Sequence, residues 1–134
     1  MQTAELAKQA GVTVHAVRHY ADIGLLNPVR NTKNGYFIYG QNDAVTMRFI
    51  KKAKSLGYSL KEIALIIGEA RKGESPCPLV RRLVDKRIVE NRKKIRFLKE
   101  AQQKMERARV AWLALKDGIP NGDSVCHLIE SISD

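Results

Sequence analysis

Two cysteines, and the histidine beside one of them, are the side chains best suited to chemistry in this 134-residue chain: Cys77, Cys126 and His127. Cys77 follows Ser75 and Pro76 at the expected start of a long helix, where the field of the helix N-terminus favours a thiolate. Because a thiolate is both a metal ligand and a nucleophile, these residues predict either metal binding or thiol chemistry. The remaining interpretation is that one or both cysteines are simply buried.

A second pair of candidate ligands, His15 and His19, is spaced four residues apart on one expected helix. This spacing is typical of zinc peptidases, but Ala16 stands where the glutamate that activates water would be, and no third ligand is nearby. The chain also has no phosphate-cradling glycine motif and no nucleophile with a paired base. The sequence therefore predicts that the protein is not an enzyme.

The distribution of charge indicates a polyanionic partner. The chain has 24 Lys and Arg against 14 Asp and Glu, a formal net charge of +10. Residues 51–116 carry a net +12, residues 1–50 a net +2 and residues 117–134 a net −4. Nucleic acid is the usual partner of so basic a protein, and an anionic membrane surface is the alternative. The basic run between Arg81 and Lys99 is either a solvated helix face or a source of long-range attraction to DNA.

Composition restricts the class of protein. Hydrophobic residues make up 44% of the chain, enough for a packed core. No apolar run approaches 18 residues, and the N-terminus lacks the pattern of a secretory signal. Two cysteines are too few for a disulfide framework. We therefore expect a cytoplasmic protein with no membrane partner.

The chain is predicted to be mainly α, with a helix-turn-helix at its start. Thr3 is the expected N-cap of a first helix that Gly11 ends, and Thr13 is the expected cap of a second helix over Val14–Asp22. Two helices joined by a short glycine turn are typical of DNA-binding proteins, although such pairs also occur as plain packing units.

A small β-hairpin follows the helix pair. Val29 and residues 36–39 lie on either side of Asn34-Gly35, a sequence typical of a tight turn. Two short strands cannot stand alone, so this hairpin must pack on the helices as a wing. Two further helices are expected, one from Asn42 or Asp43 through Leu56, and one from Leu60 to about Arg71 with a capping box of Ser59 and Glu62.

The last expected helix opens at Ser75 and runs about 40 residues, about 60 Å, because neither Gly nor Pro follows Pro78 before Gly118. One face carries residues that alternate steps of four and three, which predicts a coiled coil with a second copy, parallel or antiparallel. The alternative is a single amphipathic helix on the N-terminal domain. The residues of this stripe are Val84, Ile88, Asn91, Ile95, Leu98, Gln102, Met105, Arg109 and Trp112, with Cys77 seven residues before the first.

The order of these elements, and many residues at fixed spacing, resemble the MerR family of transcriptional regulators. The similarity lies in Val17-Arg18-His19-Tyr20, Gly24-Leu25-Leu26, Pro28 and Arg30, in Asn34-Gly35-Tyr36, Tyr39 and Asp43, and in Phe49-Ile50, Gly57-Tyr58-Ser59-Leu60 and Glu62-Ile63. The chain departs from the family at Phe37, where Arg is usual after the wing tyrosine, and Lys33 could compensate.

The resemblance implies a homodimer on a pseudo-palindromic operator in double-stranded promoter DNA, acting with RNA polymerase. It implies a winged helix-turn-helix domain over residues 1–72, a long antiparallel coiled-coil dimerisation helix over 75–117, and an effector-binding loop with a short C-terminal helix over 118–134. Lys51, Lys52 and Lys54 would be placed to touch phosphates.

The helix-turn-helix geometry independently predicts the residues that meet DNA. The start of the second helix would bring Val14, His15, Arg18 and His19 near base edges or phosphates. Tyr20, Arg30 and Tyr36, with Lys33, would hold the DNA backbone on either side. Each could instead be an ordinary surface residue, and Tyr20 and Tyr39 could be core residues.

The resemblance also implies an effector site shared by two subunits. In the metal sensors of the family, a cysteine at the head of the dimerisation helix faces a cysteine-flanked loop of the other subunit, and Cys77 and Cys126 fall at these places. The usual first loop cysteine is missing, because residues 116–118 read Lys-Asp-Gly. Two thiolates would suit Cu(I), whereas adding His127 or Asp123 would suit Zn(II), Cd(II), Pb(II) or Hg(II). Oxidation or alkylation of the cysteines is the alternative switch.

Overall fold

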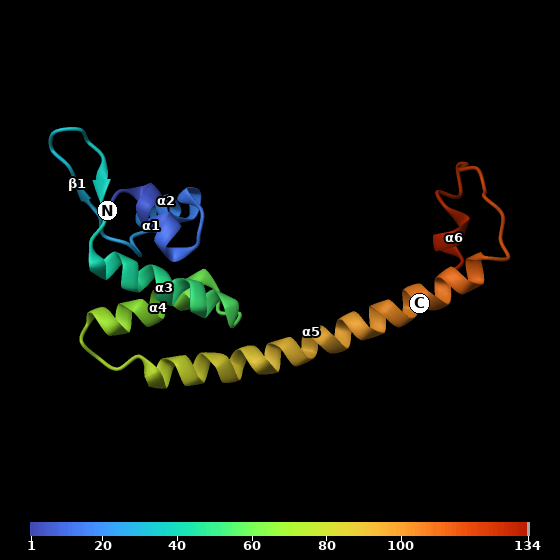
Figure 1. The fold of residues 1–134 in the computed structure, drawn as a ribbon. Helices are drawn as coiled ribbons and strands as arrows, with labels where there is room; N and C mark the ends of the chain where they lie inside the picture. The colour runs from blue at the N-terminus through green and yellow to red at the C-terminus, as the bar shows by residue number, and fades with distance from the viewer. Residues whose placement is uncertain (134) are drawn as a thin grey trace. The chain divides into compact units, whose positions relative to one another are not determined.

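The computed structural model describes residues 1–133 and is mainly helical with one small antiparallel hairpin, as the sequence predicts (Figure 1). The chain forms two compact units, Met1–Arg87 and Ile88–Asp134. The elements in order are α1 Thr3–Ala10, α2 Val14–Asp22, β1 Val29–Arg30, β2 Phe37–Ile38, α3 Gln41–Ser55, α4 Leu60–Arg71, α5 Cys77–Trp112 and α6 His127–Glu130.

Helices α1 and α2 form the expected helix-turn-helix. Gly11 ends α1 in the left-handed conformation, at φ 69°, which glycine adopts without a steric penalty. The Thr13 hydroxyl accepts a hydrogen bond from the Ala16 N–H at 3.0 Å and caps α2 as predicted. The prediction that Thr3 caps α1 is wrong, because Thr3 is the first helical residue and Gln2, in extended conformation, precedes it.

The wing is a two-stranded hairpin in which Val29 pairs with Ile38 and Arg30 with Phe37. Its loop is longer than a two-residue turn: the Asn31 N–H donates to the Tyr36 carbonyl, and the Gly35 N–H donates to the Asn31 carbonyl, each at 2.8 Å. Gly35 has φ 73°, which explains the glycine after Asn34.

Helix α3 begins earlier than predicted, after Gly40. Asp43 is therefore not the cap but a residue of the first turn, and Asn42 is also inside the helix. The buried Asp43 carboxylate accepts hydrogen bonds from the Gly40 N–H at 3.1 Å and from the Asn27 N–H at 2.8 Å. One side chain thus fixes both the start of α3 and the chain that enters the wing.

Helix α4 has the predicted bounds and the predicted capping box between Ser59 and Glu62. The hydrogen bond from the Ser59 N–H, together with the Arg87 guanidinium that forms an ion pair with the carboxylate, lowers the pKa of Glu62 below its ordinary value. Because Arg87 is in α5, this ion pair ties the head of α5 to α4.

The first unit has a hydrophobic core to which every one of its helices contributes. Leu6, Val17, Ile50 and Ile63 are fully buried at its centre. The first turns of α5 join it, because Leu79, Val80, Leu83 and Val84 pack against the core. In addition, the Tyr58 hydroxyl donates to the Val80 carbonyl at 2.9 Å.

Helix α5 has 36 residues, about 54 Å, and ends at Trp112, short of the predicted end near residue 117. After Trp112 the chain makes tighter turns, and the Trp112 indole N–H donates to the Leu128 carbonyl at 2.9 Å. The helix therefore ends where its last side chain contacts the C-terminal segment, although neither glycine nor proline stands at that point. No helix within residues 1–133 is both long enough and apolar enough to cross a membrane.

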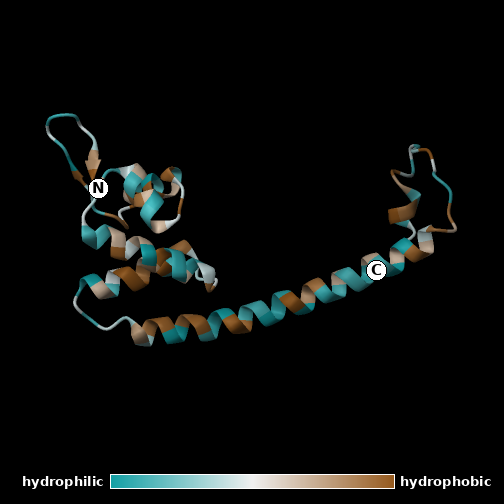
Figure 2. Cartoon of the chain, in the orientation of Figure 1, coloured by the Kyte–Doolittle hydropathy of each residue, from teal (hydrophilic) through white to brown (hydrophobic). Residues whose placement is uncertain are grey.

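In the middle of α5 the predicted apolar stripe is exposed, because no other part of the described chain packs on it. Ile88, Ile95, Leu98 and Met105 expose 43%, 53%, 64% and 69% of their surface. Apolar positions recur along the otherwise polar helix in Figure 2. An exposed stripe that keeps one face of a long helix is what a coiled-coil partner would bury.

Replacing Ile95 and Leu98 together by glutamate should convert a dimer into monomers. Each side chain would lose about 2 kcal/mol of apolar burial, and each new carboxylate would be placed at the seam without a partner. The control is Phe97→Glu, because Phe97 is 69% exposed but off the stripe. Sedimentation should report monomers for the double variant and dimers for the control; a dimeric double variant would refute the seam.

Candidate nucleic-acid interface and metal-binding loop

Helix α2 exposes one face and buries the other. Val17 and Tyr20 are buried, whereas His15, Arg18 and His19 are exposed. This separation follows from helical spacing, since residues three apart share a face. The predicted recognition residues His15, Arg18 and His19 are therefore available to a partner.

Arg18 and the wing residue Tyr36 line the same hollow. Tyr36 is 62% exposed there. The recognition helix and the wing thus present one continuous surface. The residues lining this hollow are Gln2, Thr3, Ala4, Val14, Arg18, Gly35, Tyr36 and Phe37.

Two of the residues predicted to contact DNA are buried or half-buried. The Tyr20 side chain is buried in the core of the first unit, and its hydroxyl lies 3.4 Å from the Lys54 amine, so Tyr20 takes the core role that the sequence left open. Val14 is half-buried and packs against the same core, so only part of its side chain faces outward.

The wing holds its basic residues at the surface. The Arg30 guanidinium donates to the Gly35 carbonyl at 3.2 Å and lies 4.7 Å from the centre of the Phe37 ring. Phe37, which departs from the usual arginine, therefore supports Arg30 through a cation–π contact. Lys33 is exposed in the loop, where its backbone N–H is held by the Asn31 side chain.

Two basic residues have structural roles that the sequence did not reveal. The exposed Lys51 amine donates to the carbonyls of Ala10 at 3.3 Å and Gly11 at 3.2 Å, and so caps the end of α1. Arg71 donates to the carbonyls of Gly24 at 3.0 Å and Leu25 at 2.7 Å. Cations are favoured near the carbonyls that end a helix. Each of these two cations is more than 39 residues away in the chain from the carbonyls that it bonds, so local sequence could not reveal the contacts.

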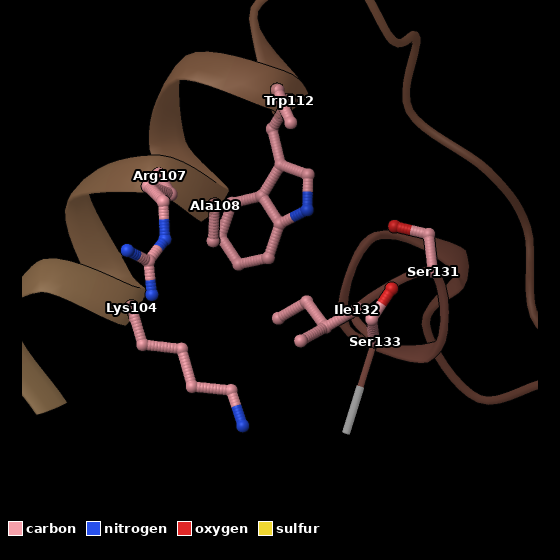
Figure 3. A pocket seen from close by; sticks show the side chains of 8 residues that line it. Lys104, Arg107, Ala108, Trp112, Ser131, Ile132 and Ser133 are labelled. Atoms are coloured by element: carbon pink, nitrogen blue, oxygen red, sulfur yellow. The ribbon is translucent and has the colours of Figure 1, made fainter. Parts of the chain in front are cut away.

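In the second unit, α6 folds back and closes the loop that follows α5. Figure 3 shows the Trp112 ring facing Ile132 across a hollow, with Lys104 and Arg107 at its other side. With the bond from Trp112 to Leu128, this packing is the anchor of the loop.

Glu130 of α6 organises the far side of the loop. Its carboxylate accepts hydrogen bonds from the Ser124 hydroxyl at 2.6 Å and from the Val125 N–H at 2.9 Å. The first of these bonds, followed by the second, lowers the pKa of Glu130, so the carboxylate form is the one that holds the loop.

The loop brings Cys126 and His127 to the wall of one hollow of about 600 Å³, together with Asp117. His127 Nε2 lies 2.7 Å from the Lys116 carbonyl. A carbonyl only accepts, so Nε2 carries the proton in the neutral ring and the Nδ1 lone pair is left as a ligand. Gly118 is required beside this ring, because a Cβ there would lie 2.4 Å from His127 Cδ2.

Cys77 is exposed as the first residue of α5, and Cys126 is half-buried just before α6. The Cys77 N–H is held by the Ser75 hydroxyl at 3.3 Å. Within residues 1–133 of a single chain, no three His, Cys, Asp or Glu side chains gather closely enough to hold a metal ion. A metal site built on Cys126 and His127 therefore needs a further ligand that these residues of the same chain do not supply.

Comparison with known proteins gives both a family and a fold. Residues 1–69 match the family described as "MerR HTH family regulatory protein", and residues 44–108 match "MerR, DNA binding". The chain is 32% identical over 100 residues to the "Heavy metal-dependent transcription regulator 2" of Rhizobium meliloti (strain 1021), covering 75% of this chain and 68% of that protein. It is 28% identical over 130 residues to the "Mercuric resistance operon regulatory protein" of Bacillus cereus, covering 96% and 93%.

The same fold occurs in a solved structure. The transcription regulator PbrR691 from Ralstonia metallidurans CH34, in complex with lead(II), superposes with a TM-score of 0.76 over 99% of both chains at 23% identity. This likeness shows the arrangement of the helices and the wing.

Replacing Arg18 by alanine should weaken specific DNA binding by about 1–3 kcal/mol, because a planar guanidinium can bond two acceptors in the groove at once. The control is Arg82→Ala, which removes the same charge from an exposed position on α5. Titration of a selected operator and of random DNA, at several salt concentrations, should show a loss of discrimination only for Arg18→Ala. Equal operator affinity of Arg18→Ala and the unmodified protein would exclude Arg18 from recognition.

Proposed function

The chain belongs to the MerR family of DNA-binding transcriptional regulators, and from that premise we propose that it is a homodimer whose hold on promoter DNA is switched by a soft metal ion bound between subunits. Because the family consists of transcription regulators, the prediction that the chain is not an enzyme is confirmed. The observation that carries the proposal is the closed loop in which Cys126 and His127 line one hollow.

The available donor atoms fit a soft or borderline metal ion. Cys126 offers a thiolate and His127 offers Nδ1, and the Cys77 thiol of the partner subunit is the proposed third ligand. Two sulfurs and one imidazole suit Zn(II), Cd(II), Pb(II) or Hg(II), whereas the two sulfurs alone suit Cu(I). The hydrogen bond from His127 to the Lys116 carbonyl orients the ring, as outer partners of metal-binding histidines usually do.

Ligands from two chains would make metal affinity depend on the relative placement of the subunits. A change in that placement can be passed to the two DNA-binding units, each of which carries a surface of α2 and wing residues. Such coupling requires that the metal be bound with different affinity in the two DNA-bound states, since tight binding alone shifts no equilibrium.

The proposed DNA target is a pseudo-palindromic operator in a promoter, where RNA polymerase is the second partner. Two copies of the surface formed by Arg18 and Tyr36 would each read one half-site, and the two-fold symmetry of a dimer would be matched by the symmetry of the operator. The net charge of +10 predicts that binding weakens steeply as salt is added.

A second candidate is the same regulator switched by an electrophile or oxidant, which the exposure of the Cys77 thiol supports. Chelators separate the two candidates, because removal of metal would abolish a metal response and leave thiol modification intact. A DNA-binding protein without an effector is the third candidate. It would respond identically with Cys126 replaced by serine.

The shared site is tested by mixing subunits. A heterodimer of Cys77→Ser and Cys126→Ser chains keeps one complete pair, formed by Cys126 of the first chain and Cys77 of the second, so it should bind about one metal ion per dimer. The matched control pairs an unmodified chain with a Cys77→Ser/Cys126→Ser chain. It has the same number of cysteines but no complete cross-subunit pair, and should bind no metal.

Two differently tagged chains allow each heterodimer to be isolated, and its metal content can be measured after equilibrium dialysis. If the control binds metal and the first heterodimer does not, the ligands lie within one chain and the proposed shared site is wrong.

A further inference from the structure

We propose that two copies of α5 pair antiparallel in a single register, in which Asn91 of each copy faces Gln102 of the other. The antiparallel direction belongs to the proposed function, because a site shared by Cys77 of one chain and Cys126 of the other needs the head of one α5 beside the tail of its partner. The new inference rests on that dimer and is the register, that is, which residues meet in it. It is carried by the part of the stripe that the chain leaves uncovered.

The uncovered part of the stripe has two natural ends. Before it, Val84 packs against the core of the first unit. After it, Trp112 is hydrogen-bonded to Leu128 and faces Ile132 (Figure 3). Between these ends, the stripe consists of six exposed residues: Ile88, Asn91, Ile95, Leu98, Gln102 and Met105.

The steps between these six residues restrict how two copies can pair. Along the chain the steps are three, four, three, four and three residues. In an antiparallel pair the layers stay level only where a step of three faces a step of three, because each residue advances both helices by about 1.5 Å. The pairing of Ile88 with the partner's Met105 meets this condition and uses all six residues.

In the same register, facing residues are alike in polarity as well as level along the two helices. Ile95 then faces the partner's Leu98, and Asn91 faces the partner's Gln102, so every apolar residue meets an apolar one. The Gln102 side-chain N–H donates to the Glu106 carboxylate at 3.1 Å. Its carbonyl oxygen is thus the atom that can accept from the partner's Asn91 amide.

Shifting the register by one heptad spoils this match. In one direction Asn91 would face the partner's Ile95, and Gln102 would face the partner's Val84. In the other direction Gln102 would face the partner's Leu98. A buried amide without a hydrogen-bonding partner is costly, so the two polar residues select the register as polar seam residues do in other coiled coils.

This register has a consequence for the effector site. Counting outward from the level of Ile88 and the partner's Met105, the partner's Arg81 falls level with Trp112, the last residue of α5, and the partner's Cys77 falls about one helical turn beyond that end. The Lys116 carbonyl is the group that holds His127. The two amide layers would therefore set where the partner's thiol lies along the loop.

Cysteine pairs test the register directly in a Cys77→Ser/Cys126→Ser background. Under mild oxidation, chains carrying Asn91→Cys and Gln102→Cys should form covalent dimers nearly completely, since the paired positions face each other. The controls are Asn91→Cys with Ile95→Cys and Asn91→Cys with Arg109→Cys, which report the two shifted registers and should form at least about fivefold less.

The outcomes separate the register from the dimer. Preferential cross-linking in a control, or no cross-linking by the test pair in a protein that sediments as a dimer, would overturn the register alone. A protein that sediments as a monomer would overturn both the register and the dimer of the proposed function.

The dimerisation affinity of leucine variants tests the register without relying on the geometry that a disulfide requires. Asn91→Leu or Gln102→Leu alone should weaken dimerisation about tenfold, and the double variant should return to within about threefold of the unmodified protein, because the two changes fall in one layer. The positions lie about 16 Å apart on one helix, so coupling within a chain is not expected. Additive effects of the two substitutions would contradict the register.

Discussion

Helix α5 is 36 residues long, and the core of the first unit takes up only its first turns, through Leu79, Val80, Leu83 and Val84. From Ile88 to Met105 the apolar stripe remains exposed, and burying such side chains is worth about 2 kcal/mol each. A second copy of the same stripe would bury these exposed side chains. The proposed dimer, the shared effector site and the pairing of two DNA-binding surfaces all depend on this exposed face.

Each end of the chain is shaped by a few side chains that bond to distant backbone. In the first unit Asp43 ties the chain that enters the wing to α3, and Lys51 caps α1 from α3, so two charged side chains hold together the elements that carry the proposed recognition surface. In the second unit Trp112 and His127 close the loop after α5. Metal coordination by Cys126 and His127 would therefore act on a loop whose closure already depends on His127. That is a physical route from ligand binding to subunit placement.

Local signals predicted local structure. The Thr13 cap, the capping box of Ser59 and Glu62, and the exposure of Arg18 follow from neighbours within four residues, and the structure has them as expected. Features that involve distant contacts were not predictable: α5 ends at Trp112, whose indole bonds to the Leu128 carbonyl across 16 residues, and not near residue 117. The start of α3 was missed because Asp43 reaches back to Gly40 from inside the helix. The sequence shows that His127 is next to Cys126, but it does not predict that His127 bonds to the Lys116 carbonyl.

In the proposed dimer, the effector site exists only when two chains meet. Equilibrium dialysis of Cd(II) against the unmodified protein and against the monomeric Ile95→Glu/Leu98→Glu variant tests this directly, with the fold of each protein verified by its helical content. We expect about one ion per chain in the dimer, and an affinity at least about a hundredfold lower in the monomer, which lacks the partner's thiolate. Equal affinity in the monomer and the dimer would contradict it, because the ligands would then belong to one chain.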